Sequence, residues 1–132
     1  IPEMSVSDFE ASISFYTKIL GFKVEYQRSE NKFAFLSLEK NQIMIQQDNT
    51  NWQTGEMKYP YGRGINLQME VSDVSSLINS LKKNKILLFR ELKDSWYRKD
   101  NKLLGNREFL VQDPDGYLLR FSEDLGTKAV RA

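Results

Sequence analysis

Arg120 is the side chain with the clearest potential for chemistry in this sequence. It lies four residues after the turn Asp113–Gly116, on a predicted strand whose other residues are almost all apolar. A guanidinium in that setting can anchor an anionic or carbonyl group of a ligand. The alternative is an internal salt bridge, for example with Glu70 or Glu108, and the sequence leaves both interpretations open.

Four further candidates lie on predicted strands. The amides of Gln46 and Asn66 can hydrogen-bond a ligand, or they can be polar groups that are satisfied within a sheet. Phe33 and Phe35 are two residues apart and therefore share one face of their strand. They belong to the core by default, and they become the wall of a ligand groove if that face lines the concave side of the sheet.

Aromatic residues in two polar segments form the third group of candidates. Trp96 and Tyr97 can provide a platform for a flat ligand, because such rings give a large contact area at low entropic cost. Alternatively, they anchor a loop on the core. Trp52, Tyr59 and Tyr61 lie in a long polar segment, where they can form a lid or serve loop packing or a dimer contact.

The composition excludes several classes of chemistry. The 132 residues include no cysteine and no histidine, which removes disulfides, thiolate chemistry and the commonest metal ligand and general base. The net charge is +1 and the basic residues are scattered, so we expect no nucleic-acid partner. No apolar run approaches the roughly 20 residues of a membrane helix. We expect a cytoplasmic protein without a membrane partner or a secretion leader.

The first half of the chain predicts a strand, a helix and three further strands. Ser7 and Glu10 have the spacing of a capping box at the start of the helix. Gly21 stands where the end of a helix favours a left-handed residue. Pro2 cannot donate to a ladder and therefore fits the start of the first strand. The strands are predicted at residues 1–6, 22–28, 32–38 and 42–47.

The second half repeats this order. The tripeptide Val6-Ser7-Asp8 recurs as Val71-Ser72-Asp73, each time at a junction between a strand and a helix. We therefore predict one α+β domain over residues 1–132, built of two tandem βαβββ modules that form a curved mixed sheet. The modules are expected at about 1–48 and 64–124, with a loop at about 49–63 and a tail at 125–132.

Within the second module, the expected elements follow the same pattern. Strands are predicted at residues 65–71 and 86–92 and in a closing hairpin at 106–121. The segment 93–105, which carries Trp96 and Tyr97, is polar and is expected to be a connection.

This arrangement resembles the vicinal oxygen chelate superfamily, which includes glyoxalase I, extradiol dioxygenases, fosfomycin-resistance enzymes and bleomycin-resistance proteins. The resemblance covers nearly the whole chain and implies the glyoxalase/bleomycin-resistance fold. It is carried by Val6-Ser7-Asp8 before the helix, Ser14-Phe15-Tyr16 and Leu20-Gly21-Phe22 toward its end, and Asn106-Arg107-Glu108-Phe109 before the turn Asp113–Gly116.

Enzymes that resemble this chain hold one divalent metal through inward residues on the first and last strands of each module, usually His, Glu or Gln. The resemblance places these positions at Ile1, Gln46, Asn66 and Arg120. An apolar side chain, two amides and a guanidinium do not make a metal site, because arginine offers no lone pair and no carboxylate or imidazole offsets the charge. We therefore expect no metal, no cofactor and no catalytic residue.

The metal-free branch, the bleomycin-resistance proteins, resembles this chain further. Its members have a proline at the position of Pro2, which marks a hinge for exchange of the N-terminal strand between the subunits of a dimer. Some carry an aromatic pair preceded by Leu-Lys-Asp, as in Leu92–Tyr97. They sequester the drug in two grooves at the dimer interface, where aromatic rings meet its flat bithiazole and acidic groups meet its cationic tail. The near-neutral charge and the basic residues Arg98, Lys99 and Lys102 depart from that pattern.

The function implied by the resemblance is non-catalytic sequestration of a planar, bleomycin-like molecule by a homodimer, with Pro2 as the hinge. One alternative is a metal-dependent glyoxalase- or dioxygenase-like enzyme with a remodelled site. Another is a sensor or interaction subunit that has lost its ligand. The ligand site is expected to comprise Phe33, Phe35, Gln46, Trp52, Asn66, Trp96, Tyr97 and Arg120.

Overall fold

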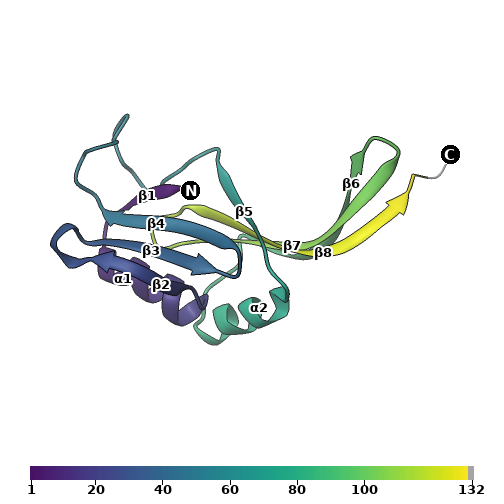
Figure 1. Ribbon diagram of the computed structural model, residues 1–132, viewed down its shortest axis with the longest axis horizontal. Coiled ribbons are helices and arrows are strands. Elements are labelled where there is room, and N and C mark those ends of the chain that lie inside the picture. Colours follow the sequence, from purple (N-terminus) through teal and green to yellow (C-terminus); the bar gives the residue numbers. More distant parts are fainter. Residues whose placement is uncertain (131–132) are drawn as a thin grey trace. The chain divides into compact units, whose positions relative to one another are not determined.

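The structure, a computed structural model, describes residues 1–130 (Figure 1). Its elements follow one another as two copies of a strand, a helix and three strands. The predicted α+β class and the two tandem βαβββ modules are therefore confirmed. Each module builds a four-stranded sheet in which the first strand runs parallel to the last. None of the helices within residues 1–130 is long and apolar enough to cross a membrane.

The chain divides into two compact units that do not coincide with the two halves of the sequence. The first unit comprises Ile1–Ile65 together with the distant turn Gln112–Tyr117. The second unit comprises Asn66–Val111 and the chain from Leu118 onward. The turn between the last two strands of the second sheet thus belongs to the first unit.

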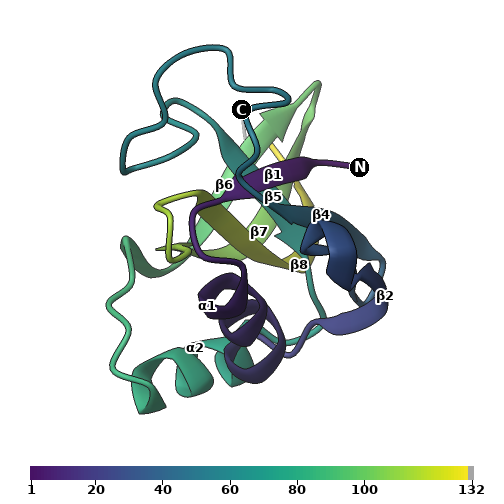
Figure 2. The ribbon, with the colours of Figure 1, turned by 90° about the vertical axis from the view of Figure 1, so that its left-hand side faces the viewer.

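The first unit contains a sheet in the order β1-β4-β3-β2. Figure 1 shows the first helix along one face of this sheet, and both Figure 1 and Figure 2 show the loop after β4 on the other side. The helix continues directly from an α-helical into a π-helical segment. The elements are β1 (Glu3–Val6), α1 (Phe9–Ser14), η1 (Phe15–Ile19), β2 (Lys23–Arg28), η2 (Ser29–Asn31), β3 (Phe33–Leu38) and β4 (Asn41–Gln47).

Strand alternation produces the core of the first unit. Residues two apart on β3 and β4 point to one face. The face toward the helix carries Ala34, Leu36, Ile43 and Ile45, and it ends at Gln47, whose amide hydrogen-bonds the backbone of Phe9 and Ser7. Gly21 ends the helical segment with a φ of 83°, as predicted. The buried side chains of this core include Met4, Val6, Phe9, Tyr16, Leu20, Ala34, Leu36, Ile43 and Ile45.

Helix α1 begins in a different way from the prediction. Asp8 is the N-cap, and its carboxylate accepts a hydrogen bond from the backbone N–H of Ala11 at 3.1 Å. Ser7 instead binds the carboxylate of Asp115, through its backbone N–H at 3.0 Å and through its hydroxyl. The capping box predicted for Ser7 and Glu10 is therefore wrong, because the hydroxyl of Ser7 donates its hydrogen bond to Asp115 and not to the helix.

The second unit contains a sheet in the order β5-β8-β7-β6, with one helix against it. The apolar stripe of this helix is buried, as are Phe109 and Val111 of β7 and Leu119 and Phe121 of β8. The elements are β5 (Asn66–Glu70), α2 (Val74–Lys83), β6 (Arg90–Lys99), β7 (Lys102–Gln112) and β8 (Leu118–Ala129). The core residues include Met69, Val74, Leu77, Ile78, Leu81, Phe109, Val111, Leu119 and Phe121.

Two boundaries in the second unit differ from the prediction. The strand predicted at residues 86–92 begins only at Arg90, and the segment 93–105, expected as a connection, forms most of β6 and the start of β7. This part of β6 is exposed on both faces, so it lacks the apolar alternation that identifies a strand. Residues 125–129 of the expected tail continue β8, whereas residues 131–132 lie outside the described residues.

Candidate functional site

The face of the first sheet that points away from α1 carries an aromatic cluster. Strand register places Tyr26, Phe35 and Met44 in one row across the sheet, and Arg28, Phe33 and Gln46 in the next row. The same rows end on β1 with Glu3 and Ser5. We call the set of Tyr26, Arg28, Phe33, Phe35, Met44 and Gln46 the aromatic face.

The rings of this face are already stacked on one another. Tyr26 lies parallel to Phe35, with centroids 5.3 Å apart and an interplanar angle of 9°. The guanidinium of Arg28 lies 4.2 Å above the ring centroid of Phe33. Phe33 is only 3% exposed, whereas Tyr26 is 48% exposed. Tyr26 is therefore the ring of this cluster that a flat ligand can reach most directly.

The structure brings three predicted site residues together on this face. Phe33 lies directly opposite Gln46 in the ladder, and Phe35 occupies the neighbouring row. Sequence patterns alone did not identify Tyr26 and Arg28 as members of the site. The alternation from Val24 through Tyr26 toward Arg28 could have indicated them, but a β-bulge between Val24 and Tyr26 obscures the register.

The loop after β4 lies on the same side of the sheet as the aromatic face (Figures 1 and 2). A pocket of about 420 Å³ opens where this loop leaves the strand. Trp52, predicted to contact a ligand, is 44% exposed in this loop. The pocket is lined by Glu30, Asn31, Lys32, Gln46, Gln47, Asp48, Asn49 and Asn51.

A second part of the loop is attached to the distant turn of the first unit. The ring of Tyr61 meets that of Tyr117 edge to face at 5.7 Å, and its backbone N–H donates to the carbonyl of Asp115 at 2.8 Å. Tyr61 therefore serves loop packing, as its alternative interpretation proposed, while Tyr59 is largely exposed.

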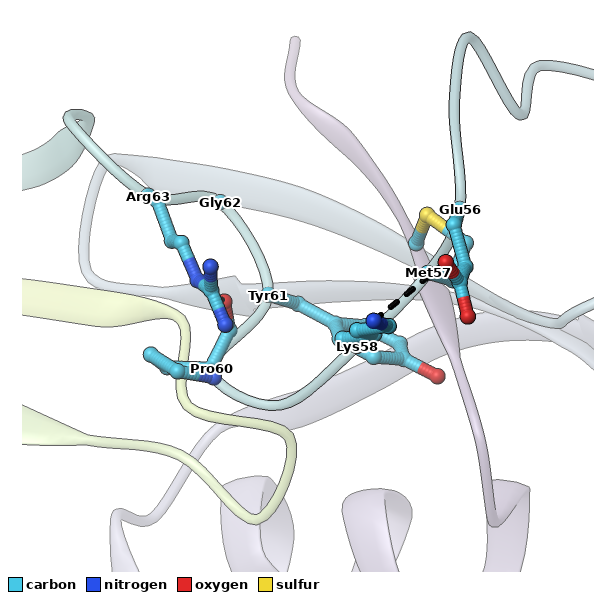
Figure 3. A pocket seen from close by; sticks show the side chains of 7 residues that line it. All are labelled: Glu56, Met57, Lys58, Pro60, Tyr61, Gly62 and Arg63. Carbon is cyan, nitrogen blue, oxygen red and sulfur yellow. Dashed lines mark hydrogen bonds and ion pairs between the residues drawn. The ribbon is translucent and has the colours of Figure 1, made fainter.

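Figure 3 shows the pocket of about 220 Å³ that this part of the loop encloses. The guanidinium of Arg63 folds back and donates to the carbonyls of Tyr59 and Pro60 at 3.0 and 3.3 Å. Lys58 pairs with Glu56 at 3.4 Å. The cations of this pocket are therefore engaged by the loop itself.

The turn of the first unit buries a carboxylate without a cation. Asp113 accepts hydrogen bonds from the hydroxyl of Tyr16 at 2.7 Å and from the backbone N–H groups of Asp115 and Tyr117 at 2.9 Å each. Burial outweighs these bonds and raises the pKa of Asp113 to about 6. Burial beside this carboxylate also raises the pKa of Tyr16. These groups hold the turn in place and do not line the aromatic face.

In the second unit, Arg120 forms an internal salt bridge. Its Nε donates to one oxygen of Glu108 at 2.9 Å, and its Nη2 donates to the other at 3.1 Å. The hydroxyl of Tyr97 contacts both partners, accepting from Arg120 at 2.9 Å and donating to Glu108. The hydrogen bonds to Glu108 raise the pKa of the Arg120 guanidinium. Of the two salt-bridge partners considered, the structure selects Glu108.

The remaining predicted site residues of the second unit do not form one cluster. Asn66 is exposed and pairs with Leu118, whereas Gln68 is the residue directly beside Arg120. The alternation from Asn66 to Gln68 could have indicated that neighbour. Trp96 lies on the other face of β6 from Tyr97, stacked over Gly105 with the ammonium of Lys128 4.0 Å from its ring centroid. Trp96 and Tyr97 therefore cannot form one stacking platform.

The four positions that correspond to metal ligands do not suit a metal. Ile1 is apolar and 66% exposed in the first unit, where Gln46 contributes only an amide. In the second unit, Asn66 contributes an amide and Arg120 a guanidinium whose charge is already matched by Glu108. Within residues 1–130, no group of three or more acidic, histidine or cysteine side chains is placed to hold a metal ion.

The predicted hinge, Pro2, lies immediately before β1. Its carbonyl accepts a hydrogen bond from the backbone N–H of Met44 at 2.9 Å. Glu3–Val6 then pair with β4 of the same chain.

Comparison with known proteins agrees with this geometry. The model of the glyoxalase/bleomycin resistance protein/dioxygenase superfamily matches residues 2–121. Bleomycin resistance proteins of Geobacillus stearothermophilus and Staphylococcus aureus are 27% identical over 135 residues, which cover 95% of this chain and 96% of theirs.

Solved structures show the same fold. A protein of unknown function from Agrobacterium tumefaciens is 26% identical with a TM-score of 0.69, covering 94% of this chain and 91% of that one. TioX from Micromonospora is 18% identical with a TM-score of 0.70, covering 93% and 95%. The chain therefore belongs to the glyoxalase/bleomycin resistance protein/dioxygenase superfamily.

Proposed function

We propose that this protein binds a flat, bleomycin-like drug without transforming it, and protects the cell by sequestering the drug in the cytoplasm. The observation that carries the proposal is the aromatic face of the first sheet, where Tyr26 is stacked on Phe35 and half exposed. A planar heteroaromatic group can extend this stack, which requires no covalent step. The similarity to bleomycin resistance proteins over almost the whole chain supports the choice of ligand class.

The polar ends of the same face suit an elongated ligand. Glu3 closes the row that contains Phe35 and Tyr26, so an acidic group lies three strands away from the exposed ring. Strand spacing makes this separation about 14 Å. A drug with a flat ring system and a cationic tail can thus place its rings on Tyr26 and its charge near Glu3, while the amide of Gln46 hydrogen-bonds between them.

The chemistry of the second unit supports binding rather than catalysis. Arg120 and Glu108 neutralise each other, and Tyr97 completes their hydrogen bonds. A general acid or base must be able to exchange a proton with a substrate, and this carboxylate is instead held by two donors of a guanidinium. We propose that the drug occupies grooves of a homodimer that the aromatic face helps to line.

Titration calorimetry with metal-free and copper-loaded bleomycin tests the ligand assignment. We expect binding in the micromolar range or tighter, and we expect Tyr26→Ala to weaken it about tenfold. Phe89→Ala is the matched control, because Phe89 is also about half exposed but lies in the second unit, outside the aromatic face. Absence of binding of both drug forms below the millimolar range would overturn the assignment.

Elemental analysis of protein purified without chelators tests the non-catalytic part of the proposal. We expect less than stoichiometric nickel, zinc, iron and manganese, because the ligand positions offer two amides and a neutralised guanidinium. A stoichiometric metal would favour the alternative of a glyoxalase- or dioxygenase-like enzyme with a remodelled site.

A further inference from the structure

Strand β6 leaves one long edge of the second sheet open. The strand is last in the order β5-β8-β7-β6, so β7 pairs with one side of it and, within residues 1–130, no strand pairs with the other. Nine of its ten residues are exposed, including the apolar or aromatic side chains of Leu92, Trp96 and Tyr97. An exposed edge of this length is a template for another strand.

The charges of β6 are arranged so that the strand complements itself. When two copies pair antiparallel about a twofold axis, opposite side chains share a face, so a residue can lie opposite itself or opposite one an even number of positions away. With Ser95 opposite Ser95, Lys93 lies opposite the ring of Tyr97. Glu91 comes near Lys99 across the irregularity of β6 between Arg90 and Lys93. No two like charges then lie opposite each other on the strand.

The neighbouring registers are unfavourable. With Asp94 opposite itself, a carboxylate faces a carboxylate. With Trp96 opposite itself, Lys93 faces Lys99. Like charges directly opposite each other destabilise a strand pair. The sequence of β6 therefore selects the register centred on Ser95, whose small side chain allows close approach at the axis.

The groups that would meet across this edge are available. Within residues 1–130, Glu91 and Lys99 form no ion pair, and both are exposed. Figure 1 shows the outer parts of β6, β7 and β8 extending beyond α2, so the helix of the second unit does not block this edge. Lysines on an edge strand can also serve to prevent pairing, and that role predicts a monomer.

We propose that β6 is a contact between two copies of this chain, which pair edge to edge about Ser95 and join their second sheets into one. The inference rests on the proposed function only in requiring a homodimer, and it assigns that dimer a specific contact and register. The partner strand would cover part of the exposed apolar area of Leu92, Trp96 and Tyr97.

A single cysteine at the proposed axis provides the most direct test. The chain has no cysteine, so Ser95→Cys introduces one unique thiol. Directly opposite residues have Cβ atoms about 4.5–5.5 Å apart, which a small adjustment brings into disulfide range. We expect mild oxidation to yield a covalent dimer on a non-reducing gel. Ser29→Cys, in the exposed turn after β2, is the matched control and should remain a single chain.

Charge reversal tests the register. Glu91→Lys and Lys99→Glu each place like charges near one another, and we expect each to raise the dimer dissociation constant about tenfold in sedimentation equilibrium at low salt. The double variant Glu91→Lys/Lys99→Glu restores opposite charges and should return the constant to near the starting value. Lys83→Glu, at the exposed end of α2, should leave it unchanged.

The outcomes separate this inference from the proposed function. A dimer that resists both reversals and does not crosslink through position 95 would overturn the β6 contact and leave drug sequestration intact. A monomer that still binds the drug would overturn the β6 contact and the interfacial groove together. A crosslinked dimer that does not bind the drug would retain the β6 contact and overturn the ligand assignment.

Discussion

The two sheets share a topology, yet their uncovered faces differ in chemistry. The first presents stacked rings whose outermost member, Tyr26, is half exposed. The second presents Arg120, Glu108 and Tyr97, which satisfy one another. The repeat of a strand, a helix and three strands therefore fixes where side chains stand in each module. It does not fix whether they are free to contact a ligand.

The two units also bury a carboxylate by different means. Asp113 is held by a tyrosine hydroxyl and two backbone N–H groups, all of them neutral donors. Glu108 is held by the guanidinium of Arg120. A neutral set of donors leaves the cost of burying a charge largely uncompensated, whereas a cation offsets it. A change of pH should therefore alter stability mainly through Asp113 of the first unit. Removing one partner of an ion pair should alter stability mainly through Glu108 and Arg120 of the second unit.

The largest effect is expected from the titration of Asp113. Its folded pKa of about 6 lies above the ordinary value, so the folded chain binds a proton that the unfolded chain has released. The free energy of unfolding should consequently fall as the pH rises from about 3 to 7, by about 3 kcal/mol. Urea unfolding across this range should show the decrease in the wild type and much less of it in Asp113→Asn.

The difference between the pH curves of the wild type and of Asp113→Asn separates the contribution of Asp113 from that of the other carboxyl groups. Asp94, for example, has its pKa lowered by hydrogen bonds from Arg107, and such a group acts in the opposite direction as the pH falls. Parallel pH curves for the wild type and Asp113→Asn would show that this carboxyl group titrates normally and that both units tolerate their buried carboxylates alike.

A somewhat smaller effect is expected at the ion pair of the second unit. Glu108→Leu leaves the partly buried Arg120 without its carboxylate and should lower the free energy of unfolding by about 2 kcal/mol. The double variant Glu108→Leu/Arg120→Leu removes both charges and should lie within about 1 kcal/mol of the wild type. Chemical denaturation measures both values.

Arg107→Ala provides the matched control for this pair. It removes an exposed ion pair with Asp94 on the same sheet and should lower the stability much less than Glu108→Leu, because water screens such a pair. A double variant as unstable as Glu108→Leu would mean that packing, and not charge compensation, dominates at this position.

The smallest effect is expected from Tyr97→Phe. This change removes one hydroxyl from the Arg120–Glu108 pair and should cost about 1 kcal/mol of stability. Drug affinity, measured by calorimetry, should change less than twofold. If Tyr97→Phe weakened binding tenfold and Tyr26→Ala did not, the roles assigned to the two faces would be reversed.

Local patterns predicted the elements whose periodicity is strong. The turn at Asp113–Gly116, the stripes of both helices and the inward positions of β8 follow from turn chemistry and alternation. The part of strand β6 from Lys93 onward was missed because both of its faces meet solvent. This part of β6 is recognised as a strand only by its pairing with β7, which the sequence of β6 alone does not reveal.

The candidate site was predictable only in part, because its contacts depend on strand register. Phe33 and Phe35 were identified from alternation along one strand and Gln46 from the family resemblance, and the structure places all three together. The face on which Tyr26 lies could be predicted only by knowing that β2 has a bulge between Val24 and Tyr26. For Arg120, the sequence could name Glu70 and Glu108 as partners but could not choose, since that choice depends on which strands are adjacent.

The turn Gln112–Tyr117 has a consequence for the order of events during synthesis. Although the first unit is mostly made from the first 65 residues, the hydroxyl groups of Ser7 and Tyr16 find their partners in this late turn. While the ribosome is still translating the second half, these groups have nothing to bind. The N-terminal module therefore cannot mature ahead of the C-terminal one, as domains of a growing chain usually do, and must wait until residue 117 has left the exit tunnel.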